Sequence, residues 1–183
     1  HIAENALAVA AALLAIGADA GTALKALADL PPPAGRGART DLLVQGGSAL
    51  LIDESYNANP ASMRAALATL ATVPRHKFPR RIAVLGDMLE LGPQSAELHA
   101  GLKDAVHEAG VAVLFACGPH MKGLYDAVND GIKGAYAATA AGLQDTLISA
   151  IQAGDVVMIK GSNGTRLQPV VAALKAHFAA PVA

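Results

Sequence analysis

LIDESYNANPASM, at residues 51–63, joins an apolar run to the start of a helix through a turn crowded with polar side chains. The apolar residues at its beginning predict the end of a buried strand. Asn59 is a favourable N-cap and Pro60 is tolerated at the first helical position, so a helix is expected to begin there. Loops between the carboxyl end of a strand and the next helix are where open α/β sheets hold their ligands. The first candidate site is therefore this turn, with Asp53, Glu54, Ser55, Tyr56, Asn57 and Asn59.

The rest of the chain repeats this order of strand and helix. The apolar runs IAVL, VAVLFA and VVMI lie at residues 82–85, 111–116 and 156–159. Such runs are typical of strands buried on both faces of a parallel sheet. A hairpin at residues 41–53, with Gly46-Gly47 as its turn, precedes them. Helices are expected at residues 60–73, 95–109, 119–128, 140–151 and 166–177. From about residue 38 the chain is predicted to be an α/β domain with an open, doubly wound, mostly parallel sheet.

The first part of the chain differs in character. Residues 1–17 and 22–30 each have a helical pattern, and the prolines at residues 31–33 end the second. This proline run is the expected domain boundary. Because the sequence begins at His1 directly in a helical pattern, we expect it to be a fragment of a longer protein.

Composition argues against several classes of protein. With 14 Lys and Arg against 15 Asp and Glu, the net charge is −1, so no basic surface indicates nucleic-acid binding. The apolar run at residues 6–16 is too short to span a bilayer. The single cysteine, Cys117, allows no disulfide within the chain and fits a reducing cytosol. Its place in an apolar strand predicts an inert thiol.

Two further polar stretches follow predicted strands. LGDMLELG, at residues 85–92, places Asp87 and Glu90 at the same sheet edge as the first turn. One of these acids could act as a general base or contact a cation, or both could simply be solvated. IKGSNGTR, at residues 159–166, offers backbone N–H groups before a helix and suits a carboxylate or phosphate oxygen. The chain contains no Gly-x-x-x-x-Gly-Lys-Ser/Thr loop, and its six histidines lack metal-binding spacing. A complete triphosphate site and a metal site are therefore not expected.

Three motifs, taken in order, resemble the C-terminal domain of the Mur ligases. They are Tyr56-Asn57-Ala58-Asn59-Pro60, Gly86-Asp87-Met88-x-Glu90-Leu91-Gly92 and Lys160-Gly161-Ser162. HIAENALA, at residues 1–8, resembles the end of that family's central ATP-binding domain. The resemblance implies a Rossmann-like C-terminal domain at residues 34–183. Residues 1–33 would then be a helical tail of the central domain plus a linker.

Within the family, the resemblance is strongest to ligases that add a D-Ala-D-Ala dipeptide to UDP-MurNAc-tripeptide in peptidoglycan precursor synthesis. It implies that ATP, with Mg²⁺ bridging its phosphates, phosphorylates the tripeptide carboxylate, and that the dipeptide amine attacks the acyl phosphate. The partners would be the missing N-terminal and central domains, with no nucleic acid and no membrane insertion. A bacterial cytoplasmic location follows. The chain alone is expected not to ligate and to bind ATP weakly.

The resemblance also implies roles for individual residues. The nucleotide contacts would be Asn5 to the adenine, Arg36 to the phosphates and Glu54 to the ribose. The cleft that closes between domains would be lined by Tyr56, Asn57 and Asn59, and the incoming dipeptide would be held by Asp87, Lys160, Ser162 and Asn163. No metal ligand and no complete catalytic set is expected among these residues. Because an absent domain would cover them, Glu54, Tyr56 and Asn57 are expected to be exposed here.

Two alternatives stay open. The first is a related ligase, such as the members that add D-glutamate or diaminopimelate, or folylpolyglutamate synthase. The diaminopimelate-adding branch typically carries an Asp-Asn-Pro-Arg motif, which this chain lacks. The second is a non-catalytic Rossmann-like binding module. Convergence of the polar loops on one sheet edge would favour a ligase, whereas their dispersal over the surface would favour the module.

Overall fold

The computed structural model of the chain describes residues 2–28 and 32–179, leaving aside the side chains of residues 2–5, 27 and 28. The chain divides into two compact units, His1–Pro32 and Pro33–Ala183. The first unit holds helices α1 (Ile2–Ala15) and α2 (Ala20–Ala28). Among the helices described, none is both long enough and apolar enough to cross a membrane.

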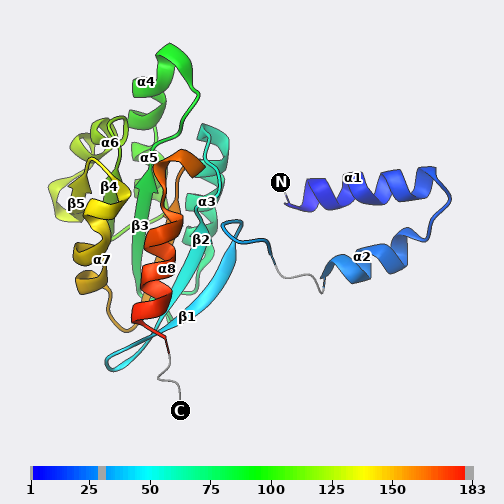
Figure 1. Cartoon of the computed structure of the whole chain (residues 1–183), viewed down its shortest axis with the longest axis horizontal. Helices are drawn as coiled ribbons and strands as arrows, with labels where there is room; N and C mark the ends of the chain where they lie inside the picture. The colour runs from blue at the N-terminus through cyan, green and yellow to red at the C-terminus, as the bar shows by residue number, and fades with distance from the viewer. Residues whose placement is uncertain (1, 29–31, 180–183) are drawn as a thin grey trace. The chain divides into compact units, whose positions relative to one another are not determined.

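The second unit is built on one six-stranded sheet (Figure 1). Its strands are β1 (Ala38–Val44), β2 (Gly47–Glu54), β3 (Arg80–Gly86), β4 (Val113–Cys117), β5 (Lys133–Ala137) and β6 (Asp155–Lys160). Their spatial order is β1-β2-β6-β3-β4-β5. The β1 strand runs antiparallel to β2, and all other neighbours are parallel. The predicted α/β class with a mostly parallel sheet is confirmed.

The hairpin between β1 and β2 forms with a turn one residue earlier than expected. Val44 pairs with Gly47, so the turn residues are Gln45 and Gly46. Gly46 has a φ of 88°, in the left-handed region that tight hairpin turns require and that glycine adopts without strain. The prediction of a turn at Gly46-Gly47 is therefore wrong by one residue, because Gly47 already belongs to β2.

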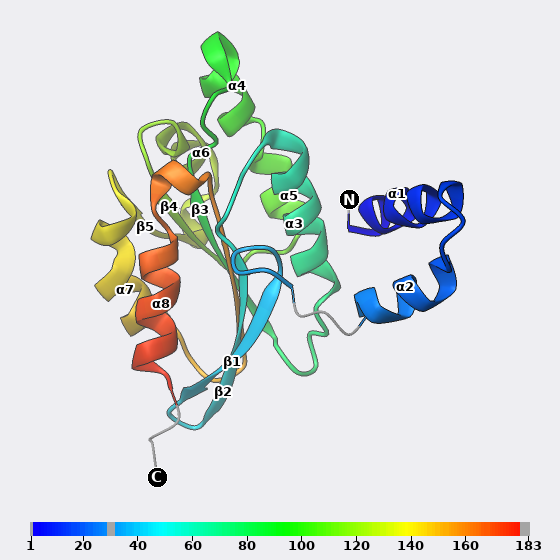
Figure 2. The same cartoon turned by 45° about the vertical axis from the view of Figure 1, so that its right-hand side comes forward.

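Helices cover both faces of the sheet, as a doubly wound fold requires. They are α3 (Pro60–Thr72), α4 (Ser95–Ala100), α5 (Lys103–Glu108), α6 (Met121–Ala127), α7 (Gln144–Ala150) and α8 (Gln168–His177), with short 3₁₀ segments η1 (Gly92–Gln94), η2 (Asp130–Ile132), η3 (Ala140–Leu143) and η4 (Asn163–Thr165). Figure 2 shows α3 and α5 on one side of the strands and α7 and α8 on the other. Each side has its own apolar cluster.

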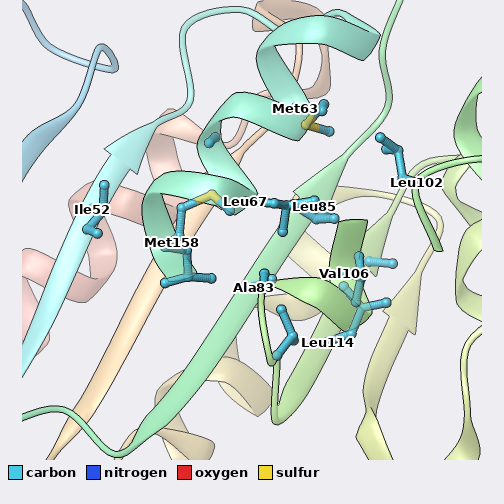
Figure 3. Packing of buried hydrophobic residues seen from close by; sticks show 14 of the residues in the cluster. Ile52, Met63, Leu67, Ala83, Leu85, Leu102, Val106, Leu114 and Met158 are labelled. Carbon is cyan, nitrogen blue, oxygen red and sulfur yellow. The ribbon is translucent and has the colours of Figure 1, made fainter. Parts of the chain in front are cut away.

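The two clusters follow from the alternation of side chains along each strand. In β2, Leu51 faces the α7–α8 side, whereas Ile52 faces α3. On the α3 side, Met63 and Leu67 lie over the sheet beside Met158 and are fully or almost fully buried (Figure 3). Burying one such side chain stabilises the fold by about 2 kcal/mol.

Several predicted helices are shorter than expected. Those expected at residues 119–128 and 140–151 are α6 and, after the 3₁₀ segment η3, α7. The helix expected at residues 95–109 is divided into α4 and α5 at Gly101, whose carbonyl accepts a 2.8 Å hydrogen bond from Arg64 Nη2 instead of continuing the helix. The helix expected from Arg166 begins at Gln168, because Arg166 has a φ of 55°. That left-handed residue ends η4 and turns the chain into α8.

The start of α3 is as predicted. Asn59 is its N-cap, and Asn59 Oδ1 accepts a 2.8 Å hydrogen bond from Ser62 N. Ser62 Oγ in turn accepts from Asn59 N at 3.0 Å, which completes a capping box. This closed arrangement fixes where the polar turn after β2 ends.

Candidate functional site

The polar loops after β2, β6 and β3 meet at the carboxyl edge of the sheet. These three strands are neighbours, with β6 in the middle. The chain after β2 and β3 leads to helices on the α3 face, whereas the chain after β6 leads to α8 on the opposite face. Such a divergence opens a crevice at the strand ends, which is where ligands bind in α/β sheets. The loops therefore converge, which favours the ligase interpretation over the binding module.

Ser162, just after β6, bonds the three loops together. Its N–H donates to Asp87 O at 3.0 Å, and its Oγ accepts from Leu89 N at 2.9 Å, so both atoms hold the loop after β3. On the other side, Ser162 Oγ donates to Ala58 O in the loop after β2 at 3.3 Å. Only 5% of Ser162 is exposed. In this structure its polar atoms are engaged within the protein.

Lys160, the last residue of β6, is also turned inward. Its ammonium donates to Asn57 O at 2.8 Å and lies 3.7 Å from Glu54 Oε2, with 4% of the side chain exposed. Burial lowers the pKa of the Lys160 ammonium below its usual range, while Glu54 opposes that shift. Lys160 therefore ties the loop after β2 to β6. Lys160 and Ser162 therefore both hold the loops of the site in place through buried hydrogen bonds.

Arg36 and Tyr56 form an exposed pair beside Glu54. Asp53 Oδ2 accepts from Gly35 N at 3.2 Å, which brings the chain before β1 against the turn after β2. The Arg36 guanidinium carbon then lies 4.4 Å from the centre of the Tyr56 ring, a cation–π geometry. Arg36 is exposed, and so is Tyr56, as expected. Glu54, also expected to be exposed, is instead half-buried, with 21% of its side chain accessible. An exposed guanidinium next to an aromatic face can bind an anion.

The predicted asparagines occupy different situations. Asn57 is exposed as expected, and its Oδ1 accepts from Ala58 N at 2.8 Å. Asn59 is engaged as the cap of α3. Asn163, exposed in η4, accepts from Gln168 Nε2 at 2.7 Å. Asn5 lies in α1, and its side chain is outside the described part of the structure.

Asp87 is buried and oriented by the start of α6. Its Oδ1 accepts from Met121 N at 2.8 Å and its Oδ2 from His120 N at 3.3 Å. Gly118, with a φ of 102°, packs against the carboxylate so closely that a Cβ there would lie 2.4 Å from Asp87 Cγ. The Asp87 carboxylate is thus held in one orientation at the end of β3.

A cleft of about 440 Å³ opens beside Asp87, between the ends of β3, β4 and β5 and the turn at η4. Its walls are mostly small or apolar. The residues that contribute them include Leu89, Pro119, Ala138, Ala140, Ala141 and Val170. Two charged side chains, Asp87 and Arg166, line it together with His120. The cleft thus combines apolar walls with one carboxylate and one guanidinium, an arrangement typical of sites for small polar ligands.

Sequence reasoning missed several parts of this site. Arg166 belongs to the stretch at residues 159–166 but was not named as a candidate site residue, and its place in one cleft with Asp87 was not predicted. Gly118 and Gln168 gave no signal, since their importance comes from contacts with Asp87 and Asn163. His99, one of the six histidines without metal-binding spacing, is fully buried.

Metal and thiol chemistry find no support among the described residues. No three His, Cys, Asp or Glu side chains of that part of the chain are arranged to bind a metal ion. Cys117 is 1% exposed, and burial, helped by Asp87, raises the pKa of its thiol to about 12. It stays protonated at neutral pH, in agreement with the inert thiol that was expected.

Comparison with known proteins decides the family. Residues 38–163 match the family described as "Mur ligase, glutamate ligase domain". The match covers the whole sheet, the loops after β2 and β3, and the first residues of the loop after β6. The chain belongs to the Mur ligase family.

Relatives in this family match nearly the whole chain. The UDP-N-acetylmuramoyl-tripeptide–D-alanyl-D-alanine ligase of Escherichia coli is 34% identical over 176 residues, which are 96% of this chain and 37% of that protein. The same ligase from Rickettsia prowazekii is 30% identical over 93% of this chain. The chain spans 36–38% of the length of the first curated relatives that it matches.

Solved Mur ligase structures have the same fold. MurF from Acinetobacter baumannii superposes with a TM-score of 0.78 at 29% identity, over 94% of this chain and 37% of that one. MurF from Thermotoga maritima, solved in complex with ADP, gives a TM-score of 0.71 at 22% identity, over 92% of this chain and 36% of that one. Both confirm the fold.

Proposed function

We propose that the chain is the C-terminal part of an ATP-dependent ligase that adds D-Ala-D-Ala to UDP-MurNAc-tripeptide through an acyl phosphate. Residues 34–183 would be its C-terminal domain, and residues 1–33 a tail of the central ATP-binding domain plus a linker. The observation that carries the proposal is the bonding of the three family motifs to one another through Ser162. Relatives that carry this activity in their names support it. A bacterial cytoplasmic location follows from these substrates.

Nucleotide binding is assigned to the edge near β2. Arg36 is exposed and can donate to phosphate oxygens, and Glu54 lies nearby, where it can accept from ribose hydroxyls. Asn5 is proposed to contact the adenine. Tyr56 and Asn57, both exposed, would line the cleft that closes between domains. We assign no described residue to Mg²⁺, because their acids do not gather into a ligand set.

The incoming dipeptide is assigned to the cleft beside Asp87. A dipeptide of alanine carries an ammonium, a carboxylate and two methyl groups. Asp87 and Arg166 supply the opposite charges, and the small apolar walls suit the methyl groups. Asn163 stands at the rim in η4. Lys160 and Ser162 are proposed to support the loops that hold the dipeptide, since their polar atoms already have partners.

Two measurements on the ligase that contains this domain test the proposal. The first offers D-Ala-D-Ala, D-glutamate and diaminopimelate as acceptors, and ligation is expected with D-Ala-D-Ala. Preference for another amine would instead indicate one of the related ligases. The second compares Arg166→Ala with Arg75→Ala, an exposed arginine outside the site. Arg166→Ala is expected to raise the KM for the dipeptide about tenfold or more, through loss of a charge-assisted bond.

The chain alone is expected to be inactive and to bind ATP weakly. Its 183 residues include no Gly-x-x-x-x-Gly-Lys-Ser/Thr loop to hold a triphosphate. Isothermal titration of the chain with Mg-ATP should therefore give little heat. Micromolar affinity would contradict this expectation.

A further inference from the structure

We propose that His99 is a positioning residue of the site described above, and that its neutral imidazole holds the loop after β3 in place for the dipeptide. The inference rests on the proposed function for its catalytic consequence. Its structural part concerns this chain alone and can be tested separately. The observations that carry it are the two hydrogen bonds of the buried ring and the position of Met88 in the loop.

Both ring nitrogens of His99 are engaged. The residue lies in α4 and is 0% exposed. Its Nδ1 lies 2.6 Å from Ser95 O, one helical turn earlier, and its Nε2 lies 2.8 Å from Met88 N in the loop after β3. The ring therefore bridges α4 and the loop.

The partners determine the protonation state of the ring. A carbonyl oxygen can only accept a hydrogen bond, so Nδ1 must carry a proton. A backbone N–H can only donate, so Nε2 must present its lone pair to Met88. The neutral Nδ1–H tautomer satisfies both contacts. A second proton, on Nε2, would face the Met88 N–H and break that hydrogen bond.

The Met88 contact completes the attachment of the loop. On either side of Met88, Asp87 O accepts from Ser162 N, and Leu89 N donates to Ser162 Oγ. These neighbours are held by the loop after β6, whereas Met88 N is held by α4. Asp87 and Leu89 both line the cleft assigned to the dipeptide. Release of Met88 N would therefore loosen the side of the cleft that carries the acid.

The surroundings of His99 favour the neutral ring. Burial lowers the pKa of the imidazole below its usual value, although the bond to Ser95 O and the Asp87 carboxylate oppose that shift. The exposed His120 ring, 5.4 Å away centre to centre, adds to the lowering. Asp87 and His120 are the titratable groups that face His99 from the β3 loop and from the segment before α6.

Two substitutions separate the two ring contacts. In His99→Asn, the amide nitrogen lies near the place of Nδ1 and can still donate to Ser95 O, but nothing reaches Met88 N. In His99→Gln, the longer amide can place its oxygen where Nε2 was and accept from Met88 N. Neither side chain titrates near neutral pH. His76→Asn and His76→Gln, at an exposed histidine, are the matched controls.

The structural part is tested by amide hydrogen exchange on the 183-residue chain. Protection of the Met88 amide should fall at least about tenfold in His99→Asn and be largely kept in His99→Gln, since a backbone donor loses its partner in the first variant alone. In the unchanged chain, the same protection should fall as acid protonates His99. Equal protection of Met88 in both variants, with melting temperatures matched, would overturn the proposal.

The functional part uses the complete ligase. His99→Asn should lower kcat/KM for the dipeptide by about 10- to 100-fold, the size of effect expected when a substrate contact is displaced by about 1 Å. The KM for ATP should not change. His99→Gln should keep most of the activity. In the pH profile of kcat/KM, this variant should also lack the part of the decrease at low pH that protonation of His99 causes. If exchange changes as expected and ligation does not, the loop contact is real and the positioning role is wrong. Absence of any dipeptide ligation by the unchanged enzyme would refute the proposed function instead.

Discussion

Gly118→Ala is the most informative single substitution for the geometry of the site. Gly118 has a φ of 102°, which alanine adopts only with strain of about 1–3 kcal/mol. The added Cβ would lie 2.4 to 2.6 Å from the three carboxylate atoms of Asp87. Because no Cβ tolerates such contacts, the carboxylate must move.

Movement of Asp87 breaks its hydrogen bonds with the start of α6. The stronger of the two, from Met121 N at 2.8 Å, is a bond to a charged group and contributes about 1.5–3 kcal/mol. With the backbone strain, the expected loss of unfolding free energy is about 3–5 kcal/mol. For a chain of this size, that lowers Tm by about 10 °C.

Gly123→Ala is the matched control. Gly123 lies in α6, five residues further on, and a Cβ there would meet nothing within 4 Å. The same change should stabilise the helix by about 0.5–1 kcal/mol. Urea unfolding of both variants, with the m-value checked for constancy, measures the difference. A loss below about 1 kcal/mol for Gly118→Ala, or equal losses for both, would refute the reasoning.

Three further predictions concern stability. Asp155→Ala leaves Arg80 without the carboxylate that it binds through Nε and Nη2 at 2.6 Å each, and should cost about 3 kcal/mol in urea unfolding. Asn59→Ala removes the cap of α3 and should lower the free energy of unfolding by about 1 kcal/mol. Asn57→Ala should change that free energy by less than about 0.5 kcal/mol, as measured by thermal unfolding. The third is a pH effect. Because burial lowers the folded-state pKa of His99 below its unfolded value of about 6.5, its contribution to stability is complete above that pH and is lost as pH falls through the folded value. Tm should therefore decrease less steeply with falling pH in His99→Gln than in the unchanged chain. An equal decrease in both would contradict the lowered pKa of His99.

Local patterns were sufficient for the fold. Continuous apolar runs predicted buried parallel strands, and the capping signal at Asn59 gave the start of α3 to the residue. These features depend on side chains within a few positions of one another. Helix ends were less predictable, since the division between α4 and α5 involves Arg64, which lies 37 residues from the Gly101 carbonyl that it binds.

The sequence by itself determined the α/β class, the family and the three polar loops, because each is carried by short contiguous patterns. Tertiary structure alone decided which polar groups remain free for a ligand. Lys160 and Ser162 have motif positions that suggest substrate contacts, yet their partners Asn57 and Ala58 lie 103 and 104 residues away in the chain. A buried polar atom must find a partner wherever the fold brings one. For that reason Lys160 and Ser162 are directed inward, whereas Arg36 and Tyr56 remain exposed at the edge of the sheet.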